Sequence, residues 1–262
     1  MELNKDILNL LELSKKTARL GLKKIAELDK KNITYTFSKE TPKEVKTEAD
    51  LEIESLILEH LKPTGLEILS EEIGLINSSI DSNLRFIIDP IDGTVNFIRN
   101  IAECSISIAL FEKDKPIFGV LASYPSGKLF WGGANLGSFE EDVKIEVSLI
   151  AQAHKGVLCS GFPSRFKFDS EELVNQIGLM KIFNKTRMLG SASQSLLQVA
   201  KGSAECYYEN EIMLWDVAAG LAIVEGSGGR VIMKRGATSQ SFNIIADNGL
   251  IKGDIYQKLT NK

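Results

Sequence analysis

Cysteine and histidine are scarce in this sequence, and their scarcity narrows the chemistry open to the chain. There are 3 cysteines and 2 histidines among 262 residues. The cysteines, Cys104, Cys159 and Cys206, are odd in number and far apart, which excludes a disulfide scaffold and gives no metal-ligand spacing. Sparse cysteines of this kind are typical of the reducing cytoplasm, so we predict a cytoplasmic protein.

Long hydrophobic runs are also missing. The longest stretch without a charged side chain runs from Met188 to Ala200, 13 residues, and serines and glutamines interrupt it. A membrane-spanning helix needs about 20 mostly apolar residues, so we predict no membrane span. The sequence begins MELNKD and shows no apolar signal region, so no secretory leader is expected.

An excess of basic charge is absent as well. Lysine and arginine total 31 against 35 aspartates and glutamates, a formal charge of −4, and the basic residues form no block. Nucleic acid is therefore not an expected partner. Neither a Gly-x-x-x-x-Gly-Lys-Ser/Thr loop nor a Gly-x-Ser-x-Gly turn occurs, which argues against nucleoside triphosphatases and serine hydrolases.

The apolar residues that are present predict alternating helices and strands in two halves. The first half has predicted helices near 7–22 and 47–61, an extended or looped stretch over 30–46, and an antiparallel meander near 66–69, 84–89, 105–110, 117–124, 128–131 and 144–147. The second half has predicted strands near 157–160, 204–208, 230–233 and 242–246, helices near 171–183, 192–201 and 215–225, and a C-terminal helix. We therefore predict a layered α/β fold whose halves, 1–146 and 147–262, form one compact unit, because no linker separates them.

The most informative segment is Asp89-Pro90-Ile91-Asp92-Gly93-Thr94, which follows an apolar strand. Two carboxylates three positions apart, with the Ile91 carbonyl between them, form a hard-oxygen set suited to Mg²⁺. Free N–H groups at Gly93 and Thr94 would favour an anion beside the metal. A lone Asp-x-x-Asp is usually a capped turn, but the surrounding proline, glycine and threonine favour the metal site.

Two further acidic segments can join this site. Glu71 and Glu72 follow a predicted strand, and burying such a like-charged pair requires a neutralising cation, whereas in isolation the pair is usually solvated. Asp216 precedes the apolar segment 217–224. It has the position of an ordinary helix N-cap, or of an N-cap that also faces a metal.

Together, Glu71-Glu72, Asp89–Thr94 and Trp215–Gly220 resemble the signatures of the inositol monophosphatase family of Mg²⁺-dependent, lithium-sensitive phosphatases. The resemblance runs from about Lys39 to Gly229. It implies a layered αβαβα sandwich of the inositol monophosphatase/fructose-1,6-bisphosphatase type. It also implies a homodimer that hydrolyses a small phosphorylated metabolite, most similar to inositol 1-phosphate, with water activated by two to three Mg²⁺ ions.

The resemblance further implies a role for individual residues. The implied metal ligands are Glu71, Asp89, the Ile91 carbonyl, Asp92 and Asp216, with Glu72 beside a weaker third ion. The implied catalytic residues are Asp50, Glu71 and Thr94, of which Thr94 and Asp50 orient the attacking water. The implied substrate-binding residues are Lys39, Asp92, Gly93, Thr94, Gly190, Ser191, Ala192 and Glu209.

Physical chemistry agrees with a cation-dependent site. A phosphate monoester carries about two negative charges near neutral pH, so a cluster of carboxylates binds it only when cations invert the local field. The segment Gly161-Phe162-Pro163 corresponds ambiguously to the family's second substrate-side loop, which leaves the substrate open. The alternatives are fructose-1,6-bisphosphatase, 3′(2′),5′-bisphosphate nucleotidase, histidinol phosphatase and, in another class, a non-catalytic regulatory binding protein on the same fold.

Overall fold

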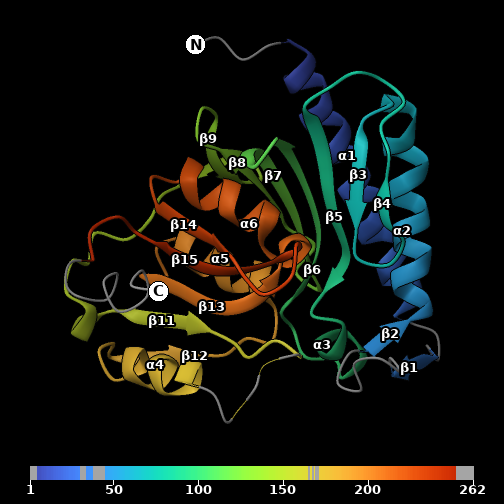
Figure 1. The fold of residues 1–262 in the computed structure, drawn as a ribbon. Helices are drawn as coiled ribbons and strands as arrows, with labels where there is room; N and C mark the ends of the chain where they lie inside the picture. Colours follow the sequence, from blue (N-terminus) through green and yellow to red (C-terminus); the bar gives the residue numbers. More distant parts are fainter. Residues whose placement is uncertain are drawn as a thin grey trace.

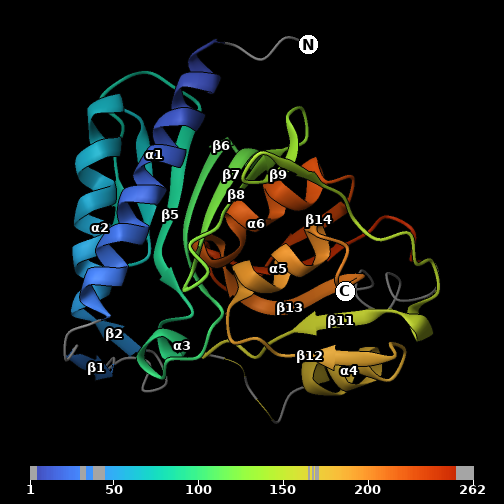
Figure 2. The same cartoon turned by 180° about the vertical axis from the view of Figure 1, so that it is seen from behind.

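Two β-sheets with a pair of helices between them organise the chain (Figures 1 and 2). The computed structural model describes residues 5–29, 34–37, 45–164, 166, 168 and 171–251. The larger sheet has the strand order β10-β9-β8-β7-β6-β5-β3-β4, and the smaller one has the order β12-β11-β13-β15-β14. Residues 252–262, where the C-terminal helix is predicted, lie outside the described part of the chain.

The first half of the chain supplies the larger sheet and the helices on its outer face. Its helices are α1 (Lys5–Leu28), α2 (Glu48–Leu61), η1 (Lys62–Thr64) and α3 (Thr94–Ile98). Its strands are β1 (Tyr35–Phe37), β2 (Val45–Thr47), β3 (Glu67–Ser70), β4 (Gly74–Ile76), β5 (Leu84–Asp92), β6 (Cys104–Glu112), β7 (Lys115–Tyr124), β8 (Leu129–Gly133), β9 (Gly137–Glu140) and β10 (Val143–Ile145). Figures 1 and 2 show α1 and α2 side by side on the larger sheet.

The second half supplies the smaller sheet and the helices on both of its faces. Its strands are β11 (Val157–Ser160), β12 (Lys185–Arg187), β13 (Cys206–Met213), β14 (Arg230–Arg235) and β15 (Ser241–Asp247). Its helices are η2 (Ala153–Lys155), α4 (Glu171–Met180), α5 (Ala192–Ala200) and α6 (Leu214–Gly226). Helices α5 and α6 lie between the two sheets and α4 lies outside the smaller one, which gives the expected αβαβα layers (Figures 1 and 2).

The sequence predicted a purely antiparallel meander in the first half, and this prediction is wrong in one place. Strands β5 to β10 do follow one another antiparallel, but β3 runs parallel to β5, with Ile68 opposite Phe86. Helix α2 begins where Thr47 predicted, because the Thr47 hydroxyl accepts a hydrogen bond from the Asp50 N–H. The stretch 30–46, predicted to be extended or looped, is extended where β1 pairs with β2.

Helix α6 joins the two halves. Nearly all of its residues are apolar and buried, as expected of a helix that is covered on every side. A side chain on Gly119 of β7 would collide with the Ala219 backbone, so this glycine permits the close approach of α6 to the larger sheet. Among the described residues, no helix is long and apolar enough to cross a membrane.

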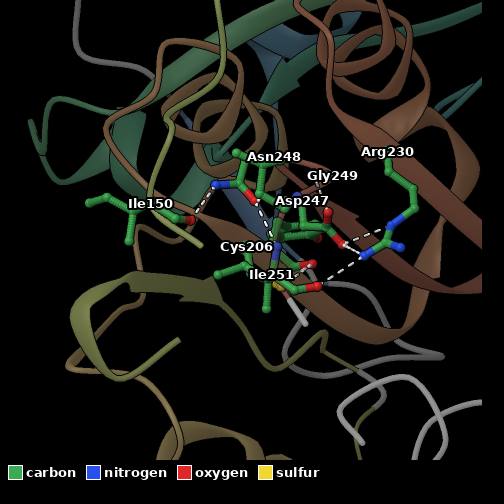
Figure 3. Close-up of polar contacts among 9 residues, drawn as sticks. Ile150, Cys206, Arg230, Asp247, Asn248, Gly249 and Ile251 are labelled. Carbon is green, nitrogen blue, oxygen red and sulfur yellow. Dashed lines mark hydrogen bonds and ion pairs between the residues drawn. The ribbon is translucent and has the colours of Figure 1, made fainter. Parts of the chain in front are cut away.

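Buried polar contacts fix the chain where it passes from one sheet to the other (Figure 3). At the end of β15, the Asn248 side-chain amide donates to the carbonyl of Ile150, 2.8 Å away, and its oxygen accepts from the Ile251 N–H. The neighbouring Asp247 is buried and forms an ion pair with Arg230 across 3.0 Å. These contacts anchor the crossover to the smaller sheet.

Candidate active site

Strand β5 delivers two carboxylates to one point. Its register with β6 shifts between Asp89 and Asp92, a bulge of the kind that redirects side chains at functional sites. The Ile91 N–H donates to Asp89 Oδ1 at 3.0 Å, so the turn after Asp89 is held by the carboxylate itself. The sequence predicted this convergence from the three-residue spacing.

Gly93 makes the turn that follows. Its φ is +91°, and a β-carbon there would lie 2.9 Å from the Glu103 carbonyl oxygen and 3.2 Å from the Ser191 β-carbon. Only glycine combines this conformation with so little space. The short helix α3 then begins at Thr94.

A third carboxylate comes from α6. Oxygens of Asp89, Asp92 and Asp216 all lie within 4.8 Å of one another. The prediction that Asp216 is the N-cap of α6 is wrong. The helix begins two residues earlier, at Leu214, with Met213 as its N-cap. Asp216 Oδ2 instead accepts from the Met213 N–H at 3.3 Å, so the carboxylate sits in the first turn and one oxygen remains for the cluster.

The carboxyl groups of the cluster hold their protons more tightly than usual because they are buried and crowded together. Burial and the charges of Glu71, Asp92 and Asp216 raise the pKa of Asp89 well above its usual range. Burial and the charges of Asp50 and Glu72 raise the pKa of Glu71 to about 8. No hydrogen-bond donor among the described residues reaches the buried Asp89 Oδ2, and this is costly unless a cation binds there.

The two adjacent glutamates face different partners. Glu71 lies in the turn after β3 and lines the cavity described below. The side chain of Glu72 is almost fully buried and accepts a hydrogen bond from Lys46 Nζ on β2, 2.7 Å away. Lys46 therefore already neutralises the charge of Glu72, and a metal ion beside Glu72 would compete with this ion pair.

Thr94 links the cluster to α2. Its hydroxyl lies 3.0 Å from the Ile91 carbonyl oxygen and 3.5 Å from Asp50 Oδ1. The other oxygen of Asp50 accepts from both the N–H and the hydroxyl of Thr47, at 2.8 and 2.7 Å. Burial raises the pKa of Asp50 to about 6. The structure thus brings together the Asp50 and Thr94 that the sequence paired.

The first turn of α5 surrounds Asp92. Asp92 Oδ2 accepts from the Ser191 hydroxyl at 2.5 Å, from the Ser193 N–H at 2.8 Å and from the Ser193 hydroxyl. Asp92 Oδ1 has one such contact within the described part of the chain, with the Ala192 N–H at 3.4 Å. The Ser191 side chain, predicted to bind substrate, is therefore directed to Asp92, and one Asp92 oxygen is left for the cluster.

A cavity of about 240 Å³ opens beside these groups. The predicted residues that line it are Glu71, Asp92, Gly93, Thr94, Gly190, Ser191, Ala192, Glu209 and Asp216. Four other predicted residues do not line the cavity but interact with residues that do. Asp50 and the Ile91 carbonyl contact Thr94, Asp89 lies beside Asp92 and Asp216, and the charge of Glu72 acts on Glu71. Lys39 lies outside the described residues.

Glu209 also lines the cavity, close enough to the cluster for its charge to act on Asp216. It lies within β13 rather than at a strand end, because β13 continues past a bulge to Met213. Its Oε2 accepts from the buried Tyr207 hydroxyl at 2.9 Å, and burial raises its pKa to about 8. A β-carbon on Gly161 would approach the Glu209 carboxylate to 2.7 Å, so this glycine leaves room for it.

Sequence reasoning missed several other residues on the cavity wall. They include Ser160, Ser164, Ser195 and Glu211, whereas Phe162 belongs to the segment that resembles the family's second substrate-side loop. Phe162 belongs to an aromatic group with Phe166 and Phe168, with ring centroids 4.8 to 5.3 Å apart. The glycine and proline around Phe162 were a local signal for this loop, but its place beside the cavity depends on the register of β11 with β13.

Comparisons with known proteins agree with this geometry. The profile of the inositol monophosphatase family matches residues 5–262. Inositol-1-monophosphatase of Synechocystis sp. is 33% identical, with 81% of this chain and 76% of that protein covered. The fructose-1,6-bisphosphatase/inositol-1-monophosphatase of Aquifex aeolicus is 30% identical, with 94% of each covered. The structure of extragenic suppressor protein suhB from Bartonella henselae matches with a TM-score of 0.84 at 26% identity, covering 96% of this chain and 98% of that one.

The layered fold and the acidic cavity are those of a phosphoric monoester hydrolase. The chain belongs to the inositol monophosphatase family, a family of metal-dependent phosphatases. The αβαβα architecture predicted from the sequence is confirmed by the structure and by these relatives.

Proposed function

We propose that the protein is a Mg²⁺-dependent phosphatase that hydrolyses a small monophosphate ester of a polyol such as inositol 1-phosphate. The observation that carries this proposal is the carboxylate cluster of Asp89, Asp92 and Asp216 at the wall of a small cavity. The names of its relatives, which include inositol-1-monophosphatase, support the same substrate class.

The donor set fits magnesium. Carboxylates and a backbone carbonyl are ligands that Mg²⁺ prefers, and no donor among the described residues occupies Asp89 Oδ2. Glu71, Asp89, the Ile91 carbonyl, Asp92 and Asp216 would hold the ions. When bound, Mg²⁺ supplies positive charge for the phosphate and makes water a stronger nucleophile.

The chain's own residues orient that water. The Thr94 hydroxyl donates its one proton to the Ile91 carbonyl or to Asp50, so its lone pairs can accept a hydrogen bond from a water in the cavity. Asp50, held by Thr47, is placed to receive a proton through Thr94. The pair therefore fixes the direction of the nucleophile and can take up its proton.

Replacing Thr94 by valine should lower kcat by about a hundredfold, the usual contribution of a positioned proton-transfer group. Valine keeps the shape of the side chain and removes the hydroxyl, so KM should change little. The matched variant Thr94→Ser keeps the hydroxyl and should retain most of the activity. Steady-state phosphate release measures both, and equal rates for the valine and serine variants would contradict the role of the hydroxyl.

Glu209 suits the alcohol part of the substrate. The Glu209 carboxylate accepts hydrogen bonds, as the hydroxyls of a polyol require, and Tyr207 fixes it. The small volume of the cavity also favours a compact metabolite.

A substrate panel tests the proposal. Inositol 1-phosphate, fructose 1,6-bisphosphate, 3′-phosphoadenosine 5′-phosphate and histidinol phosphate are compared for phosphate release with Mg²⁺, with and without chelator. We expect the highest kcat/KM for inositol 1-phosphate and no release after chelation. A higher value for another ester would overturn the substrate. Absence of release from all four would overturn the phosphatase and favour a non-catalytic binding role.

A further inference from the structure

Asp92 is held by a chain of hydroxyl groups that reaches back into the larger sheet. The Ser193 hydroxyl contacts Asp92 Oδ2, and the Ser105 hydroxyl lies 2.5 Å from the Ser193 hydroxyl. Ser105 is on β6, directly opposite Asp92 in the β5–β6 register, and both serines are fully buried. Three elements, β5, β6 and α5, therefore meet at this chain.

The direction of the hydrogen bonds among these hydroxyl groups follows from the carboxylate of Asp92, to which they lead. An ionised carboxylate only accepts hydrogen bonds, so the Ser193 proton points to Asp92. The Ser193 oxygen must then accept, and Ser105 donates to it. Hydroxyl groups aligned in one direction polarise one another, so each bond in such a chain strengthens the next.

The arrangement selects one oxygen of Asp92 for the cluster. Oδ2 has three donors, Ser191, the Ser193 N–H and the Ser193 hydroxyl, which use all of its lone-pair directions. From the described residues, Oδ1 receives only the long contact with the Ala192 N–H. Rotation of the carboxylate would break the bonds to Oδ2, so its orientation is fixed by α5.

We infer that Ser193, supported by Ser105, is a positioning residue that orients Asp92 for metal binding. This inference rests on the metal role proposed above for Asp92. Neither serine touches the substrate side: both are absent from the described lining of the cavity. Partners of this kind behind a ligand are usually worth a factor of 10 to 100 in metal affinity.

Calorimetric titration of the full chain with Mn²⁺ tests this inference. Ser193→Ala should weaken Mn²⁺ binding by about tenfold or more, and it should raise the Mg²⁺ concentration for half-maximal phosphate release. The kcat at saturating Mg²⁺ should change little, because the metal can still be forced into place. Ser105→Ala should act in the same direction with a smaller effect, and it decides the question if Ser193→Ala does not fold.

Ser123→Ala is the matched control. Ser123 is buried and accepts a hydrogen bond from Gln194 on α5 at 2.7 Å, but it does not contact Asp92. Its Mn²⁺ affinity should equal that of the wild type. Wild-type affinity in both Ser193→Ala and Ser105→Ala would overturn the inference while leaving the proposed function intact. A wild-type protein that neither binds Mn²⁺ nor releases phosphate would overturn both.

Discussion

Replacing Asp92 by asparagine should lower phosphate release by at least about a thousandfold and leave the fold in place. Asparagine has the same shape, and its amide oxygen can still accept the bonds from Ser191 and Ser193. Its amide nitrogen then replaces the oxygen that faces Asp89 and Asp216, so a metal ligand and a negative charge are lost together. Metal ions contribute several kcal/mol of transition-state stabilisation, and each 1.36 kcal/mol is a factor of ten in rate.

Asp114→Asn is the control for the same chemical change at the surface. Asp114 is exposed and forms ion pairs with Arg85 and Arg235, and neither arginine belongs to the carboxylate cluster. Its activity should match that of the wild type, and circular dichroism should show the same fold for both variants. Wild-type-like turnover of Asp92→Asn at saturating Mg²⁺ would refute the assignment of Asp92 as a ligand.

Magnesium should raise the melting temperature of the protein by about 5 to 10 °C. In the metal-free protein, Asp89 is buried against Glu71, Asp92 and Asp216, and these charges oppose folding. An ion that binds only the folded state at 100 times its Kd adds about 2.7 kcal/mol of stability, and each kcal/mol is worth about 2–4 °C in a chain of this size. Differential scanning fluorimetry with and without chelator measures the shift.

Asp89→Asn separates this effect from general salt stabilisation. The substitution removes one buried charge, so its melting temperature in chelator should be no lower than that of the wild type. Its response to Mg²⁺ should be lost. KCl at matched ionic strength should not reproduce the wild-type shift, and an equal shift with KCl would show that the cluster is not a specific cation site.

The local parts of the site could be predicted from the sequence. Asp89 and Asp92 lie in the last part of an apolar strand, directly before a glycine turn, so their convergence depends on neighbours in the chain. Thr47 marked the start of α2 because N-cap chemistry is local. Such features are determined by residues close together in the sequence, so the structure agrees with their prediction.

The parts that depend on sheet order could not be predicted. Ser193 reaches Asp92 across about a hundred residues, and this contact exists only because α5 packs between the two sheets. Glu209 lies inside β13 rather than at its end because pairing with β15 extends the strand past a bulge. Asp216 is in the first turn of α6 because the helix starts at Leu214, a buried apolar residue that gives no N-cap signal.

The central claim is that the carboxylate cluster binds catalytic metal ions. Crystals of the full chain soaked in Mn²⁺, which binds to carboxylate ligands as Mg²⁺ does and scatters anomalously, test it most directly. The account predicts anomalous peaks beside the carboxylates of Glu71, Asp89, Asp92 and Asp216, at the wall of the cavity. Saturating Mn²⁺ with no peak among these residues, in crystals of a protein that still releases phosphate, would contradict it.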